Sequence, residues 1–392
     1  MSVTFARGFM ASGLSVGLKE NGNSDLSLVV SADLNKVPTA AVFTKNKFAA
    51  APVRLSQANL GNSKGFAVGV MLNSGCANAA TGEEGEYAAS ASLHALGERL
   101  GIDPALLLVC STGLIGKYLE YEKIILGVPD LVAGLGDDEL HGQLAARAIM
   151  TTDTKMKQSH AEADGIRVGG MAKGAGMINP DMATMLSVIT TDADVSPDEL
   201  HALLVSAVDK SFNTLSIDGC TSTNDTVCLL ASGASHKANL AVLGELLDSV
   251  CMDLAKQIAM DAEGATKTVL FKVKGAKDEA SAKFAARCVG QSLLVKTSIY
   301  GKDVYPGRIV SELGASAVDF DPAAVKVFYG SHCVFAGGKP LSIDADLSEK
   351  LKAYMEQDEI EISCDLANGS AEGHLIGTDL GHGYIDENMK TS

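Results

Sequence analysis

The stretch of this 392-residue chain most informative for chemistry reads GGMAKGAGMINPDMATML from Gly169 to Leu186. A glycine-rich segment and a proline lead to Thr184, which opens an apolar, β-branched run to Thr190. A hydroxyl placed there could attack the carbonyl carbon of Ala183, and hydrolysis of the resulting ester would free Thr184 as a new N-terminus. Such a threonine carries its own base, because an α-amino group has a pKa of about 7.7–8.0.

Two other interpretations of this stretch remain open. Threonine is common in strands, so Thr184 could be an ordinary strand residue behind an intact peptide bond. The glycines could instead cradle a phosphate, although the P-loop order of glycines followed by Lys-Ser/Thr is absent. None of the eight histidines lies in an evident triad arrangement, and an N-terminal nucleophile would need none.

The elements that must position Thr184 alternate between strands and helices. Ser196, Pro197 and Glu199 form a capping box that predicts a helix to Lys210, and Gly101 is expected to end a helix through Leu100. Gly169–Gly176 is predicted to be a loop, and Gly134–Gly142 a surface connection. The other predicted elements are strands at 26–30, 40–44, 66–72, 106–110, 185–190, 226–231 and 268–273 and a helix at 240–260, which together predict a large mixed α/β protein.

The composition excludes several classes of protein. A formal net charge of −16 argues against a nucleic-acid partner, and the lack of tryptophan argues against a base-stacking surface. The longest apolar runs are strand-sized, so no membrane span is expected, and the N-terminus has no secretory pattern. We therefore expect a cytosolic protein. The eight scattered cysteines have no zinc or redox spacing and are expected to be mostly reduced and buried.

Several blocks around this core resemble the ornithine acetyltransferase family, in the same order along the chain. The stretch before Leu186 is similar to the family's processing motif, with Thr184 at the cleavage and nucleophile position. The similarity runs from Phe5 to about Arg308 and weakens after that. The other matching blocks are residues 73–82, 110–116, 148–154, 211–213, 218–227, 263–267 and 294–297.

The resemblance implies roles for individual residues. Thr112 and Gly113 match the family's oxyanion pair, which fits a hydroxyl and a backbone N–H at a strand-to-loop turn. Lys173 matches a substrate contact that could hold an α-carboxylate. Thr151 matches another, with Thr152 as its rival. The remaining substrate contacts that the resemblance implies are Glu263, for the side-chain ammonium of ornithine, and Asn388 and Ser392 near the C-terminus.

The sequence departs from the family pattern in two places. Val304-Tyr305-Pro306 stands where the family usually has Pro-Asn-Trp before Gly307-Arg308, and the interval between Asn388 and Ser392 is one residue short. A lost tryptophan and a moved proline change the shape of a loop. These departures concern acceptor specificity and leave the segment before Thr184 unchanged.

The fold that the resemblance implies is a multilayer α/β structure, helix-sheet-sheet-helix, which is ornithine acetyltransferase/DmpA-like and similar in layering to N-terminal-nucleophile hydrolases. Residues 1–183 would form an α chain and residues 184–392 a β chain, assembled as α2β2. The implied reaction moves acetyl from N2-acetylornithine to glutamate without metal or organic cofactor, and acetyl-CoA as a further donor is left open. The alternatives are an amide hydrolase or aminopeptidase with the same nucleophile, and an uncleaved, non-catalytic paralogue that binds an amino acid.

Overall fold

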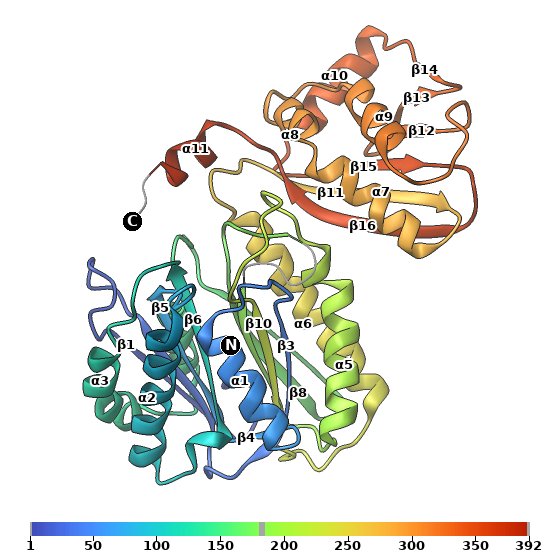
Figure 1. Ribbon diagram of the computed structural model, residues 1–392. Helices are drawn as coiled ribbons and strands as arrows, with labels where there is room; N and C mark the ends of the chain where they lie inside the picture. The colour runs from blue at the N-terminus through green and yellow to red at the C-terminus, as the bar shows by residue number, and fades with distance from the viewer. Residues whose placement is uncertain (1, 180–184, 390–392) are drawn as a thin grey trace. The chain divides into compact units, whose positions relative to one another are not determined.

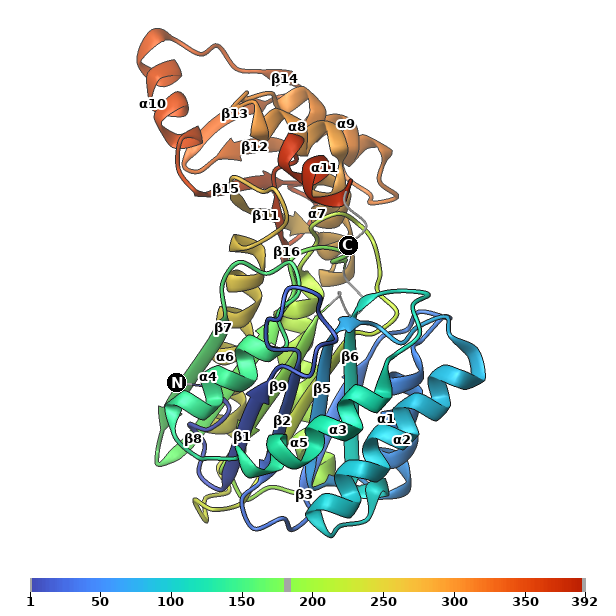
Figure 2. The same ribbon diagram turned by 90° about the vertical axis from the view of Figure 1, so that its left-hand side faces the viewer.

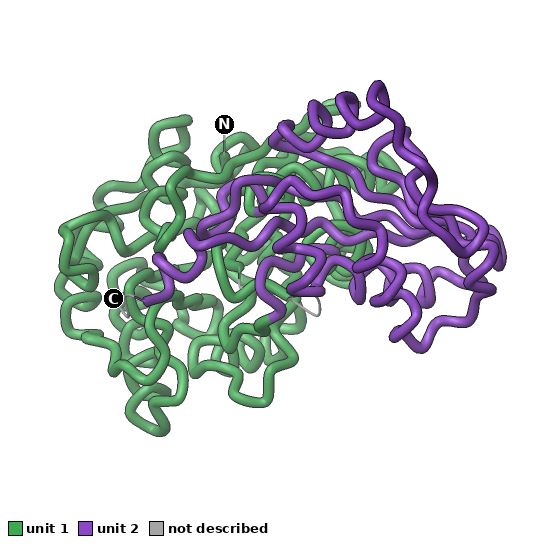
Figure 3. Tube along the Cα trace, turned by 90° about the horizontal axis from the view of Figure 1, so that it is seen from above, with its two compact units in different colours: residues 1–213, 220–258 green, residues 214–219, 259–392 purple. Residues whose placement is uncertain are grey.

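The computed structural model describes residues 2–179 and 185–389, so Ala183, Thr184 and Ser392 lie outside the described residues. No helix in these two ranges is long and apolar enough to span a membrane. The chain divides into two compact units, coloured separately in Figure 3. Unit 1 comprises Met1–Asn213 and Cys220–Ile258, and unit 2 comprises Thr214–Gly219 and Ala259–Ser392.

Unit 1 is built on two sheets (Figure 1). The first has four strands in the order β1 (Phe9–Leu14), β2 (Leu26–Ser31), β5 (Gly69–Cys76) and β6 (Leu107–Leu114). The second has six strands in the order β4 (Phe66–Ala67), β3 (Val37–Phe43), β10 (Thr226–Ala231), β9 (Leu186–Thr191), β8 (Ile166–Lys173) and β7 (Lys157–Ala163). The predicted strand after residue 184 therefore lies inside a sheet, with a neighbour on each side.

Helices cover the outer faces of these sheets (Figure 2). One core cluster joins the two sheets, for example through Leu72 and Val188, and a second joins the first sheet to helices through Met71 and Leu93. The predicted helix-sheet-sheet-helix layering is confirmed in unit 1. Its helices are α1 (Ala51–Asn62), α2 (Gly82–Leu100), α3 (Tyr121–Ala133), α4 (Glu139–Ala148), α5 (Pro197–Lys210) and α6 (Leu240–Met260), with short 3₁₀ turns at Pro104–Leu106 and Phe212–Thr214.

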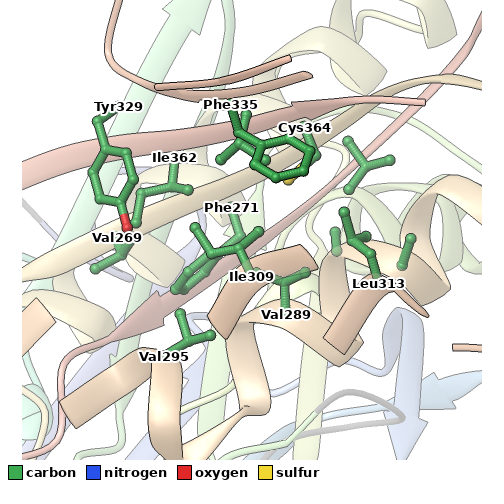
Figure 4. Packing of buried hydrophobic residues seen from close by; sticks show 14 of the residues in the cluster. Val269, Phe271, Val289, Val295, Ile309, Leu313, Tyr329, Phe335, Ile362 and Cys364 are labelled. Carbon is green, nitrogen blue, oxygen red and sulfur yellow. The ribbon is translucent and has the colours of Figure 1, made fainter. Parts of the chain in front are cut away.

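Unit 2 is a second α/β body with its own sheet. Its strand order is β14 (Lys339–Pro340), β13 (His332–Ala336), β12 (Lys326–Tyr329), β15 (Glu359–Asp365), β11 (Thr268–Ala276) and β16 (Ala371–Thr378). Phe271 packs in one buried cluster with Val289 and Ile309 from the covering helices (Figure 4). The helices are α7 (Glu279–Gln291), α8 (Leu293–Tyr300), α9 (Pro306–Ala315), α10 (Ala345–Met355) and α11 (His382–Asn388).

Local sequence signals for helix ends are confirmed. Ser196 accepts a hydrogen bond from the backbone N–H of Glu199, and the Glu199 side chain accepts one in return from the Ser196 backbone, so α5 has the predicted capping box. Gly101 ends α2 with a φ of +71°, in the left-handed region that favours glycine. Pro306 takes the first turn of α9, so the segment that departs from the family pattern starts a helix.

Several local predictions were wrong, three of them outside the segment 107–114. The predicted strand 66–72 is two strands in different sheets, with β4 pairing with β3 and β5 pairing with β2. The expected surface connection 134–142 gives way to α4 at Glu139, because Asp138 accepts the backbone N–H of His141 as a cap. The predicted loop 169–176 is strand β8 up to Lys173. Its glycines permit close packing, since a Cβ at Gly169 would overlap the carbonyl oxygen of Ser2.

Candidate active site

The predicted oxyanion pair lies at the end of β6. A strand-to-loop turn was expected at Thr112 and Gly113, but the strand continues through both residues to Leu114. Gly113 pairs with Gly75 on β5, where the ladder shifts register. A β-bulge of this kind disrupts the regular ladder and re-aims the backbone groups around it. Gly113 has a φ of +132°, and a Cβ there would overlap the backbone of Gly75, so glycine is required.

Buried amides fix this strand end. The Asn224 side chain donates to the carbonyl oxygens of Ala77 and Ser111 over 2.6 and 2.9 Å. Ser111 in turn donates through its hydroxyl to Oδ1 of Asn73 over 2.6 Å. Three of the blocks that resemble the family, at 73–82, 110–116 and 218–227, thus converge beside Thr112, which is buried. The strand end is therefore held rigidly, as preorganised donors require.

A second group of predicted residues gathers around Asp153. One carboxylate oxygen of Asp153 accepts from Nζ of Lys157 over 2.6 Å and from the backbone N–H of Gly174 over 2.7 Å. The other accepts from the backbone N–H of Thr151 over 2.9 Å and lies 3.8 Å from Nζ of Lys173. The two predicted substrate contacts in unit 1, Thr151 and Lys173, are thus joined by one carboxylate. Thr152, the rival of Thr151, is exposed.

Electrostatics explain why this carboxylate is charged in the interior. Burial by itself would raise the pKa of Asp153, but the ammonium groups of Lys173 and Lys157 and the hydrogen bonds outweigh it, and the pKa is held well below its ordinary value. The side chain of Lys173 is 5% exposed. A lysine in a loop is usually solvated, whereas this one lies at the end of β8 with most of its surface covered.

The residue that follows Thr184 is also anchored. The backbone N–H of Met185 donates to Oδ1 of Asp225 over 2.9 Å. Asp225 is fully buried, and this burial raises its pKa well above the ordinary value, although the Met185 amide and the charge of Lys173 oppose the shift. Leu186 then pairs with Lys173 on β8 and with Thr226 on β10. The start of β9 is therefore fixed on both sides.

Unit 2 holds two further predicted substrate contacts. The side-chain amide of Asn388, at the end of α11, donates to Oε2 of Glu263 over 3.0 Å and to the carbonyl oxygen of Tyr384 over 2.9 Å. The hydroxyl of Tyr384 donates to Oδ2 of Asp218 over 3.2 Å. Glu263 and Asn388 are 125 residues apart, so only the fold brings them together.

A buried lysine braces this part of unit 2. Nζ of Lys296 donates to the carbonyl oxygens of Ile217 and Thr378 over 2.7 and 2.8 Å and to the Thr378 hydroxyl over 3.1 Å. Burial lowers the pKa of Lys296 to about 8, while the nearby carboxylates of Asp379 and Asp218 raise it. Lys296 thereby joins the segment before α11 to the segment 214–219.

Sequence reasoning missed several of these positioning residues. Asp153, Asn224 and Asp225 fall inside the blocks that carry the resemblance, but no role was assigned to them. A signal was available for Asp153, because Lys157 follows it by four residues and Lys173 lies in the processing segment. No group of three or more His, Cys, Asp or Glu residues suited to a metal occurs in the part of the chain that the structure describes. The eight cysteines all lie within the described ranges, none of them is in a disulfide there, and five are buried.

Comparison with known proteins identifies the family. The ArgJ family model matches residues 10–391, which is almost the whole chain. The chain belongs to the ArgJ family. "Arginine biosynthesis bifunctional protein ArgJ" from Thermosynechococcus vestitus is 42% identical over 99% of this chain and 97% of its own length. The protein of the same name from Thermobifida fusca is 41% identical over the full length of both.

A solved structure supports the same relationship. The crystal structure of the arginine biosynthesis bifunctional protein from Bacillus halodurans matches with a TM-score of 0.50 and 34% identity. The match covers 53% of this ArgJ-family chain and 99% of the solved chain. The predicted family, and with it the prediction of an enzyme, are confirmed, as is the predicted α/β fold class.

Proposed function

We propose that this ArgJ-family chain cuts itself between Ala183 and Thr184 and then transfers acetyl from N2-acetylornithine to glutamate through an acyl-Thr184 ester. The observation that carries the proposal is the pairing of Lys173 with Leu186, two residues beyond Thr184. The ladder thus brings a buried cation next to the strand that follows the expected nucleophile. The names of the relatives, which place them in arginine biosynthesis, support the choice of substrates.

In the first half-reaction, Oγ of Thr184 attacks the acetyl carbonyl carbon. The new α-amino group takes the hydroxyl proton and returns it to the departing N2 nitrogen, so ornithine leaves as the amine. In the second half-reaction the α-amine of glutamate attacks the ester, and N-acetylglutamate leaves with Thr184 restored. The hydroxyl of Thr112 and the backbone N–H of Gly113 would stabilise the oxyanion in both steps.

In this proposal each charged substrate contact has the charge opposite to that of the substrate group it binds. Lys173 would hold the α-carboxylate and Thr151 would line the same region, while Glu263 would receive the side-chain ammonium of ornithine. Asn388 donates to Glu263 and fixes the position of this carboxylate, which suits a charge-assisted hydrogen bond to an ammonium group. The resemblance also gives Ser392 a substrate contact, at a position outside the described residues.

Cleavage would leave the two chains interleaved. Strands β9 and β10 belong to the proposed β chain, residues 184–392, yet they lie between β3 and β8 of the proposed α chain, residues 1–183. Backbone ladders on both sides would hold the cut chains together without the peptide bond. An α2β2 assembly and a cytosolic location are further parts of the proposal.

Intact mass spectrometry of the purified protein beside its Thr184→Ala variant tests the self-cleavage. We expect two fragments from the wild type whose masses sum to the full chain plus one water, and a single uncut chain from the variant. An uncut chain in both would refute the mechanism and favour the non-catalytic alternative.

A steady-state assay tests the reaction. N2-Acetylornithine with glutamate should give N-acetylglutamate and ornithine in equal amounts, with parallel double-reciprocal plots. Free acetate, formed without any need for glutamate, would instead identify an amide hydrolase. The same assay with acetyl-CoA in place of N2-acetylornithine decides whether the enzyme is bifunctional.

A further inference from the structure

The connection between β1 and β2 carries a lysine to which the proposed mechanism gives no role. Lys19 lies in a loop that the buried carboxylate of Asp25 fixes by accepting the backbone N–H groups of Val16, Leu18 and Lys19 over 2.7, 2.6 and 3.1 Å. Three hydrogen bonds to one carboxylate make this a rigid loop. Lys19 is therefore held in a defined place, although it does not belong to a helix or a strand.

The stem of Lys19 lies against the strand that pairs with the proposed oxyanion site. A Cβ added to Gly75 would lie 3.2 Å from Cγ of Lys19, so the lysine stem passes directly over this glycine. Gly75 is the partner of Gly113 in the ladder between β5 and β6. Lys19 therefore lies beside β5, and β5 is the neighbour of β6, the strand that carries the proposed oxyanion donor Gly113.

The ammonium group is only partly satisfied by the protein. Nζ of Lys19 donates to the carbonyl oxygen of Ser24 over 2.7 Å, and its other two N–H groups have no acceptor within the described ranges. The residue is half-buried, so a ligand can reach it. An ammonium with spare donors in a partly covered position suits a charge-assisted hydrogen bond to an anion.

The surrounding charges favour an anion at this place. The pKa of Lys19 is lowered to about 8, because burial and the charge of Lys173 together outweigh the carboxylates of Asp25 and Asp153, which raise it. Lys19 is therefore close enough to both Lys173 and Asp153 to feel their charges. Two further ammonium groups, on Lys157 and Lys173, lie against Asp153, so the ammonium of Lys19 belongs to a group of cations that suits an anionic ligand.

We propose that Lys19 binds the α-carboxylate of the substrate together with Lys173. In an N2-acetylated amino acid the α-carboxylate is attached to the carbon that bears the reacting nitrogen. A group that holds it must therefore lie next to the site where the acetyl carbonyl is polarised, and the contact of Lys19 with Gly75 meets this condition. Because donor and acceptor both carry an α-carboxylate, Lys19 acts in both half-reactions.

This inference rests on the proposed function. The experiment is therefore chosen so that a failure of the role of Lys19 can be told from a failure of the proposed reaction. Calorimetry with the cleaved wild-type enzyme measures the binding of ornithine and of putrescine, which is ornithine without its α-carboxylate. Lys19→Met keeps an unbranched stem over Gly75 and removes the charge. We expect it to weaken ornithine binding by about 10- to 100-fold, the effect of losing a hydrogen bond between charged groups, and to leave putrescine binding unchanged.

A matched control, Lys123 in α3, contacts the same loop. Lys123 donates from Nζ to the carbonyl oxygen of Gly17 over 2.8 Å and, like Lys19, is half-buried, but its ammonium pairs with Glu120, so Lys123→Met should leave the affinity for ornithine unchanged. Lys19→Arg, which keeps the charge, should recover part of the affinity. In steady-state assays Lys19→Met should raise KM for N2-acetylornithine and for glutamate while kcat changes little.

The outcomes are distinct. Equal binding of ornithine by wild type and Lys19→Met, or an equal loss for ornithine and putrescine, overturns the role of Lys19. Carboxylate-dependent binding without any acetyl transfer leaves Lys19 as a carboxylate contact and refutes the proposed reaction. A wild-type enzyme that binds no ornithine refutes both.

Discussion

Gly264 and Tyr384 approach so closely that a Cβ on the glycine would overlap the backbone nitrogen of the tyrosine. Gly264 has a φ of +64°, so an L-side chain would also be strained there. This close approach joins the segment after α6 to α11, and it places Glu263 within hydrogen-bonding distance of Asn388. The pairing of these two predicted substrate contacts thus depends on a neighbouring residue that has no side chain.

Gly264→Ala should separate α11 from Glu263 and weaken the binding of the ornithine side chain. We expect KM for N2-acetylornithine to rise about tenfold or more, with a smaller change for glutamate, because only ornithine carries the ammonium that Glu263 would bind. Gly314→Ala, in α9 of the same unit, is the control. A Cβ there meets nothing within 4 Å, and alanine should leave activity unchanged. Equal kinetics for wild type and Gly264→Ala would contradict this role.

Asp153→Asn should destabilise unit 1 at neutral pH. The substitution leaves the ammonium groups of Lys157 and Lys173 buried without their countercharge, and breaking a buried pair in this way costs about 3–5 kcal/mol. Because the folded pKa of Asp153 lies below its unfolded value of about 3.9, its stabilisation is present above pH 4 and is lost as the pH falls through the folded pKa.

Urea unfolding between pH 7 and pH 3 measures this difference. The gap in unfolding free energy between wild type and Asp153→Asn should be constant from pH 7 to about pH 5 and should shrink below about pH 4. Asp248→Asn removes an exposed partner of Lys210, and its effect should be about 1 kcal/mol or less. A gap that widens as the pH falls would show that Asp153 is not stabilised as an anion.

Thr112→Val tests the oxyanion site with little change in volume. If the hydroxyl stabilises the oxyanion, its loss should lower kcat by about 10²- to 10³-fold, with a smaller effect on KM, because the interaction forms in the transition state. Thr112→Ser keeps the hydroxyl and should retain most of the activity. A Val variant with nearly wild-type kcat would leave Gly113 and other groups as the oxyanion donors.

Much of the fold follows from local sequence signals. The capping box at Ser196 and Glu199 and the stop at Gly101 depend on neighbouring residues only, so the sequence alone predicts where α5 begins and α2 ends. The apolar run after Thr184 likewise predicts β9. By contrast, the glycines at 169–176 have the composition of a loop. Gly169 and Gly170 nevertheless lie in strand β8, where Ser2 and α6 pack against them, and such distant contacts leave no local pattern.

In the candidate site, too, some residues could be predicted from the sequence and others depend on distant contacts. The resemblance named Thr151 and Lys173 as contacts, and the structure brings both to Asp153. The resemblance gave Asp153 no role. The spacing of Asp153 and Lys157 was a local signal, but the second lysine, Lys173, comes to this carboxylate only once β7, β8 and the segment before them have packed. Lys19 was missed for a related reason: it lies in an irregular loop, and the residues that suggest its role, Gly75 and Lys173, are far away in sequence.

The anchoring of Met185 by Asp225 leads to a prediction on self-cleavage. Asp225→Ala removes the acceptor of the Met185 N–H, so the start of β9 loses the bond that fixes the backbone next to the expected cleavage point. Leaving a buried donor without a partner costs about 1–3 kcal/mol. If positioning the Ala183–Thr184 bond uses this contact, cleavage should slow by about tenfold or more in an intact-mass time course.

Asp225→Asn keeps an oxygen at the same position, and burial favours a neutral side chain there, so this variant should cleave at nearly the wild-type rate. Slow cleavage in both variants would instead indicate that the acidic proton of Asp225 takes part in the acyl shift, and rapid cleavage in both would show that the ladder pairing of Leu186 is sufficient to position the bond.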